Sequence, residues 1–194
     1  MIKDIAHMCR SYRRFYQDQP IDPALLTDWV DTARITASSA NAQPLRYRIF
    51  HRPQDCAELF PCMAWAGALP DWDGPQEGER PSAYIVVLRD QNVCLGERFT
   101  AWDEGIAAQT IMLAATEAGF GGCMIGSFKK ESVARICGVA GEDSPLSPDL
   151  VLALGKPKED VRLAEPRPDG SLKYYRDEEQ VHYVPKRPLE DVLL

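Results

Sequence analysis

The sequence predicts an α+β fold in which helices flank a central sheet. Three observations carry this prediction: a continuous apolar run at 83–88, an amphipathic pattern at 25–33 and a long, largely apolar segment of helical character at 103–118. A continuous apolar run is typical of a strand in the middle of a sheet. The strands and helices do not alternate regularly, which favours an α+β sandwich over repeated βαβ units.

The two main helices have recognisable boundaries. Asp22 and Pro23 suit an N-cap followed by proline at the first helical position, and apolar residues then recur at helical spacing as far as Ala33. The helix at 103–118 is apolar nearly all round and stops before Gly119, a plausible capping glycine. We expect this second helix to be buried on most sides.

Two further strands and a short helix complete the expected core. Apolar and basic residues alternate at 45–49, which indicates a half-buried strand, and 150–154 is expected to be another inner strand. Ser127 is expected to cap a short helix that runs through Cys137.

Two long segments lack this periodicity. Residues 58–80 hold several glycines and prolines, and we expect a lid or an insertion beside a pocket. Within this segment, Trp65 and Trp72 either pack in the core or touch a substrate. Residues 156–194 are rich in charge and proline and are expected to form an extended arm that docks on a surface. The whole chain, 1–194, is expected to form one domain.

Composition argues against several classes of protein. A formal net charge of -7 disfavours nucleic-acid binding, and no apolar stretch approaches the roughly 20 residues that span a bilayer. The first residues lack the features of a secretory signal, so we expect a cytoplasmic protein with free thiols. The six cysteines form no CxxC pair and the three histidines lie far from them, so no metal site is expected.

Positive charge gathers at the two ends of this acidic chain. Arg10, Ser11 and Arg13 follow the expected end of an early helix, and Lys186 and Arg187 lie near the other end. Guanidinium and hydroxyl groups at this spacing can surround a phosphate with charge-assisted hydrogen bonds. Solvated surface charge is the alternative interpretation.

Two other segments carry polar or glycine-rich patterns. The loop that holds Ser38, Ser39, Asn41 and Gln43 offers donors and acceptors that match the edge of a flavin pyrimidine ring, although an ordinary helix-to-strand turn would have a similar composition. The glycines at 119–126 would allow backbone N–H groups to approach a planar ligand, or they form a tight connection. This segment follows a helix and lacks GxGxxG spacing, so it is not a dinucleotide fingerprint.

Together these motifs resemble the nitroreductase family, whose pattern runs R-S-x-R, then P-S-x-x-N-x-Q-P-W, then D-x-G-x-A-x-Q followed by G-x-G. Asp103 to Gln109 supply the third element here. The resemblance covers nearly the whole chain and implies a nitroreductase-like sandwich with a mostly antiparallel sheet flanked by helices, and an extended C-terminal arm. Three positions depart from the pattern: Cys9, Ala37 and Leu45 stand where relatives often have arginine, proline and tryptophan.

The resemblance also implies a set of residues that bind FMN. Arg10, Ser11 and Arg13 would hold the phosphate and part of the ring edge, and Arg13 would stabilise the reduced flavin, while the next residue, Arg14, would face solvent. Lys186 or Arg187 would return to the phosphate. The other implied contacts are Ser38, Ser39, Asn41 and, more weakly, Gln43, together with backbone N–H groups of Ile125 and Gly126 near the flavin N5 and O4.

The implied function is a ping-pong transfer of hydride from NADH or NADPH, through flavin N5, to a nitroaromatic, a quinone or a similar organic acceptor. The cofactor performs this chemistry, so no catalytic protein residue is required. The apolar helix at 103–118 and the arm at 156–194, which lacks a core of its own, predict an obligate homodimer with FMN at its interface, as the resemblance also implies. A monomer with this helix at the centre of its core is the alternative. Two alternatives stay open: a sensor or store that holds FMN without turnover, and a dehalogenase-like or flavin-consuming enzyme on the same fold.

Overall fold

The computed structural model describes residues 1–67, 69 and 72–194. The strands of its main sheet are β1 (Phe15–Tyr16), β2 (Leu45–Phe50), β3 (Ala83–Asp90), β4 (Gly121–Ile125) and β5 (Leu146–Pro157). They follow the order β1-β5-β3-β2, β4 also pairs with β5, and every pair is antiparallel. The antiparallel sheet is therefore confirmed, and the apolar run predicted as a central strand is β3, which has a neighbour on each side.

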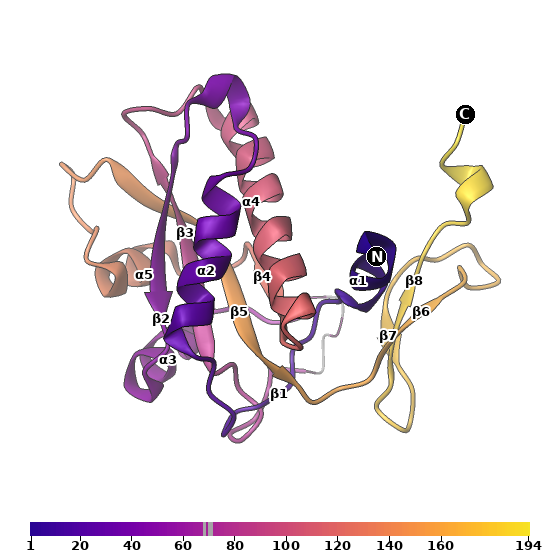
Figure 1. Ribbon diagram of the computed structural model, residues 1–194. Helices are drawn as coiled ribbons and strands as arrows, with labels where there is room; N and C mark the ends of the chain where they lie inside the picture. Colours follow the sequence, from indigo (N-terminus) through magenta and orange to yellow (C-terminus); the bar gives the residue numbers. More distant parts are fainter. Residues whose placement is uncertain (68, 70–71) are drawn as a thin grey trace.

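Helices cover both faces of this sheet. They are α2 (Pro23–Arg34), α3 (Pro53–Leu59), α4 (Glu97–Glu117) and α5 (Lys130–Cys137). Ile85 and Leu152 pack with α2 and α4 on one face, and Tyr84 and Val86 pack with α3 and α5 on the other. Successive strand residues point to opposite faces, so one continuous apolar run supplies both cores. Figure 1 shows α2 and α4 side by side along the sheet.

The helix ends agree with the sequence at α2 and α4 and differ at α5. The Asp22 side chain accepts the backbone N–H of Ala24 at 2.9 Å, as an N-cap should. Gly119 follows α4 with a φ of 77°, a conformation that suits glycine. However, α5 begins at Lys130 without a side-chain cap. The predicted cap at Ser127 is therefore wrong, and the Ser127 carbonyl instead accepts a backbone hydrogen bond.

The helix α4 is longer than predicted and is not covered on all sides within one chain. It begins at Glu97, and its Ala108 is fully buried. Phe99, Trp102 and Ile106 stay 40%, 49% and 40% exposed. The expectation that this helix is buried on most sides is wrong for a single chain. These three residues recur at helical spacing, and we call them the apolar stripe of α4.

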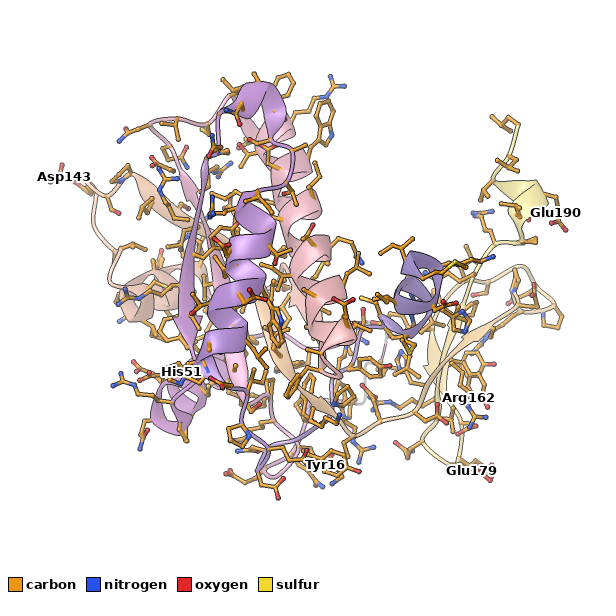
Figure 2. All side chains as sticks on the ribbon, in the orientation of Figure 1. Tyr16, His51, Asp143, Arg162, Glu179 and Glu190 are labelled. Atoms are coloured by element: carbon orange, nitrogen blue, oxygen red, sulfur yellow. The ribbon has the colours of Figure 1, made fainter. Side chains whose placement is uncertain are left out.

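The C-terminal arm contains a second, smaller sheet. Its strands are β6 (Val161–Ala164), β7 (Tyr175–Arg176) and β8 (His182–Pro185). The order is β6-β8-β7, with β8 parallel to β6 and antiparallel to β7. Figure 1 shows this arm beside α1 (Ile2–Met8) and apart from the main sheet. In Figure 2 the labelled arm residues Arg162, Glu179 and Glu190 lie on the side opposite Asp143.

Disulfides, metal-binding clusters and membrane-spanning helices are absent from the described residues. All six cysteines are free thiols. The part of the chain that the structure describes holds no cluster of three His, Cys, Asp or Glu side chains that could bind a metal ion. No helix in it is long and apolar enough to cross a membrane.

Candidate cofactor site

A cavity of about 320 Å³ lies between α1, α4 and the C-terminal arm, and we call it the basic pocket. Arg10, Ser11 and Arg13 line it from the segment that follows α1, and Lys186 lines it from the residue that follows β8. Residues far apart in the sequence thus meet, as the resemblance implies. The neighbouring Arg187 is exposed and is not among the lining residues.

The side-chain cations of the basic pocket are not neutralised by ion pairs with carboxylates of the described residues. A guanidinium N–H of Arg13 donates to the Ser11 carbonyl at 3.2 Å, and the Arg13 guanidinium lies 5.1 Å from the centre of the Tyr174 ring. Among the described residues, no carboxylate forms an ion pair with the side chains of Arg10, Arg13 or Lys186. Like charges in one cavity repel each other, so the pocket favours an anion.

The segment after α1 reaches this pocket because it lies directly against β4. Ser11 forms a parallel bridge with Gly122, and the Tyr12 N–H donates to the Gly122 carbonyl at 2.9 Å. A Cβ at Gly122 would lie 2.2 Å from the Ala153 carbonyl oxygen, so only glycine fits at this position. The glycine-rich segment is therefore a strand, and this glycine contacts protein rather than ligand.

The end of β4 borders a second cavity of about 200 Å³, which shares Arg13, Met124 and Tyr174 with the basic pocket. Ile125 and Gly126 both line it. Along a strand, the main-chain groups of successive residues point alternately to one side and the other. The Gly122 carbonyl points away from β5, toward Tyr12, so the main-chain groups of Ile125, three residues later, point toward β5. A Cβ built on Gly126 meets no described atom within 4 Å. Of the two expected donors, Gly126 is the better placed.

Part of the segment expected to be a lid, 58–80, borders this second cavity through residues 64–67. Trp65 lines the cavity, so packing and contact with a substrate are both compatible with its position. Trp72 lies under the Arg176 guanidinium, 4.4 Å from the ring centroid, and connects the segment to the arm. Part of this segment lies outside the described residues: 68, 70 and 71. The lid stays a prediction.

Arg14 does not face solvent, and that expectation is wrong. Its guanidinium donates two hydrogen bonds to the Glu79 carboxylate, at 2.6 and 2.9 Å. Lys158 forms an ion pair with the same carboxylate at 3.0 Å. The hydrogen bond from Arg14 is the main reason that the pKa of Glu79 is lowered to about 2. Arg14 therefore has a structural partner, whereas the Arg13 side chain faces the cavities.

The expected polar loop folds against α4. Asp103, which is 4% exposed, accepts hydrogen bonds from the Ser38 hydroxyl at 3.1 Å and from the Ser39 amide and hydroxyl at 2.7 and 2.9 Å. Positive φ angles occur at three positions of this loop: Ala40 (47°), Asn41 (54°) and Gln43 (49°). Such angles are costly for residues other than glycine and often mark functional sites. Asp103 thus holds a strained loop in place.

The polar loop and the basic pocket contact different stretches of α4 within one chain. Asp103 holds the loop, whereas Gln109 and Met112, six and nine residues further along the helix, line the basic pocket. Six to nine helical residues correspond to about 9 to 13 Å. A third cavity, of about 360 Å³, lies beside the loop, is lined by Ser38 and Gln43, and shares no lining residue with the other two. Figure 1 shows the loop after α2 at one end of α4 and α1 near the other.

Two residues of these sites were not predicted from the sequence. Asp103 belongs to the D-x-G-x-A-x-Q pattern, and an acidic residue in an otherwise apolar helix is a signal for a buried hydrogen-bond acceptor. His182 is 1% exposed, lines the basic pocket and packs against Tyr174 with ring centroids 5.2 Å apart. No motif in the sequence marks this histidine.

Comparisons with known proteins agree with this fold. A family model described as the nitroreductase family matches residues 8–156. A Bacillus subtilis protein named as an NAD(P)H nitroreductase, YodC, is 23% identical over 180 residues, which cover 79% of this chain and 88% of that protein. A nitroreductase family protein from Streptococcus pneumoniae superposes with a TM-score of 0.70 at 17% identity, covering 100% of this chain and 99% of the other. A nitroreductase from Desulfovibrio desulfuricans, solved in complex with FMN, has a TM-score of 0.68 at 20% identity and covers 100% and 95%.

Proposed function

This chain belongs to the nitroreductase family, and from that premise we propose that it is an FMN-dependent oxidoreductase that uses NADH or NADPH as reductant. The observation that carries the proposal is the basic pocket, where Arg10, Arg13 and Lys186 gather without a carboxylate partner among the described residues. FMN ends in one phosphate, which matches a single cluster of cations. The protein named YodC and the FMN complex support the same choice.

The described side chains fit such a cofactor. Arg10 Nε and both ring nitrogens of His182 are buried without a hydrogen-bond partner among the described residues, as expected of groups that bind a ligand. The second cavity continues from the basic pocket through shared residues, so a ligand with an anionic tail and a planar head can occupy both. When bound, FMN would supply the acceptance and donation of hydride.

The residues of the chain would bind and orient the cofactor. Arg10, Ser11, Arg13 and Lys186 hold the phosphate and the adjacent ring edge with charge-assisted hydrogen bonds. Arg13 also places positive charge where negative charge develops on reduction. Gly126 donates its backbone N–H to the ring edge. A nicotinamide, and then an organic acceptor such as a nitroaromatic or a quinone, would bind in turn at the same open face of the flavin ring.

The polar loop joins this site through a second copy of the chain. Ser38 and Gln43 line a cavity that shares no lining residue with the basic pocket of their own chain, so we assign them, together with Ser39 and Asn41, to the pocket of a partner. The apolar stripe of α4 is the surface that the partner covers, since exposed aromatic and aliphatic side chains at one face of a helix favour association. The proposed assembly is a homodimer with two FMN sites at its interface.

The test is the visible spectrum of the purified protein, followed by identification of the flavin released on denaturation. We expect a yellow protein that releases FMN. A colourless protein that takes up no added FMN would refute the assignment, and released FAD would refute the match to a single terminal phosphate.

Anaerobic NADH or NADPH should bleach the bound flavin, and an acceptor should restore the colour. If the flavin is not bleached, the chain is a binding protein without turnover. Analysis of the products with a halogenated aromatic, and of the flavin after turnover, separates a dehalogenase-like or flavin-consuming enzyme.

A further inference from the structure

His182 is fixed in the wall of the basic pocket. It begins β8, its backbone N–H donates to the Asp160 carbonyl at 2.9 Å, and its ring packs against Tyr174 at an interplanar angle of 36°. Only 1% of the residue is exposed. The backbone hydrogen bond and the packing around the ring therefore restrict the position of the imidazole.

Both ring nitrogens of His182 are buried, and neither has a hydrogen-bond partner among the described residues. A neutral imidazole carries one N–H donor and one acceptor nitrogen. A buried polar group without a partner is costly, and a bound ligand can supply the partner. Because His182 lines a cavity together with Arg10, Ser11 and Lys186, an anion in that cavity is the natural partner.

The charges around His182 keep its ring neutral. Burial, together with the nearby positive charges of Arg13 and Arg176, lowers the pKa of His182 to about 4. Arg176 is itself paired with Glu159 at 2.9 Å, and the other cations that face the ring across the cavity belong to the basic pocket. A neutral imidazole donates an N–H to an anion without adding repulsion to this cluster of cations.

The position of His182 determines which part of the cofactor it can contact. It lines the basic pocket but not the second cavity at the end of β4, where the ring would lie. We propose that His182 is a further phosphate ligand of FMN, which donates an imidazole N–H to a phosphate oxygen and so helps the site to distinguish FMN from riboflavin. This inference rests on the proposed function.

The first test compares the affinity of the full-length apoprotein for FMN and for riboflavin in wild type, His182→Leu and His182→Gln. Losing a hydrogen bond to a charged group weakens binding by about ten- to a hundredfold, so His182→Leu should lose FMN affinity to that extent and keep its riboflavin affinity. His182→Gln retains an N–H donor and should restore most of the FMN affinity. Equal losses for both flavins, or unchanged FMN binding in His182→Leu, would overturn the proposal.

A second test needs no variant that must fold. The chain has three histidines, so the imidazole nitrogen resonances of the wild-type protein can be followed individually by NMR, with His7 and His51 as internal controls. FMN should shift the His182 nitrogens far more than riboflavin does. Wild-type protein that binds FMN with no such difference would refute the role of His182 alone, whereas wild-type protein that fails to bind FMN would refute the proposed function.

Discussion

The basic pocket and the polar loop satisfy their polar groups in opposite ways. In the loop, the hydroxyls of Ser38 and Ser39 and one amide are bonded to Asp103 of the same chain. In the pocket, the cations have no carboxylate partner and the ring nitrogens of His182 have no hydrogen-bond partner among the described residues. The loop is therefore organised by the chain itself, while the pocket is organised for a ligand. Changes to the loop should first alter stability, and changes to the pocket should first alter binding.

The largest effect on FMN binding should come from preventing dimer formation, which keeps the polar loop of one chain away from the basic pocket of the other. Ile106→Arg places a charge in the apolar stripe of α4, and we expect a monomer that no longer holds FMN, because the loop of a second chain is then absent from the pocket. Light scattering together with flavin absorbance measures both. Tyr16→Arg changes a residue that is 42% exposed at the edge strand β1, and this control should stay dimeric and yellow. A monomeric Ile106→Arg with wild-type FMN affinity would show that the loop plays no part in the site.

A smaller effect is expected within the pocket. Arg13→Ala should weaken FMN binding by about ten- to a hundredfold, the cost of losing a hydrogen bond to a charged group. The unfolding midpoint of the apoprotein should change little. Arg52→Ala, which removes a surface guanidinium paired with Asp55, is the matched control and should bind FMN normally. Arg14→Ala should do the reverse of Arg13→Ala, lowering stability through Glu79 while sparing affinity; equal FMN losses in the two variants would contradict this division.

At the loop the expected effect is on stability. Asp103→Ala leaves three hydrogen-bond donors without their acceptor and should lower the free energy of unfolding by about 1–3 kcal/mol. Asp103→Asn keeps an acceptor oxygen and should lose less. Urea unfolding of the two apoproteins measures the difference. If both variants unfold like wild type, Asp103 does not hold the loop.

The smallest expected effect concerns the next residue of α4. Burial, with the Asp149 carboxylate nearby, raises the pKa of Glu104 from 4.5 to about 7. The folded chain then keeps a proton that the unfolded chain releases, so stability should fall as the pH rises from about 4.5 toward about 7. Glu104→Gln should flatten the pH dependence of the melting temperature over this range. If the melting temperature of Glu104→Gln depends on pH as steeply as that of wild type, another group causes the pH dependence.

Local patterns predicted the parts of the fold that depend on neighbouring residues. The long apolar run of β3 and the Asp22 cap are visible in the sequence because each depends on a few adjacent positions. The strands of the arm are two to four residues long, too short for a periodic pattern, and were not predicted. Serine is a common N-cap residue, but α5 begins three residues after Ser127, and the Ser127 carbonyl accepts the backbone N–H of Ala64.

The site shows the same division between local and distant information. Arg10 to Arg13 form a compact motif, and the structure places it at a cavity with Lys186, as the resemblance implies. The sequence could not show that Arg14 pairs with Glu79, 65 residues away, or that His182 packs against Tyr174 in the basic pocket, because folding brings these residues together. The separation of the polar loop from the pocket likewise became visible only in three dimensions.

The most direct test of a site shared between two chains is the mass of the wild-type protein that carries flavin, measured by light scattering during dilution. We expect FMN to travel only with a species of about twice the 21.7 kDa of one chain, at one FMN per chain, and to be released as the dimer dissociates. A compact monomer that retains FMN and is still reduced by NADH or NADPH would contradict the shared site.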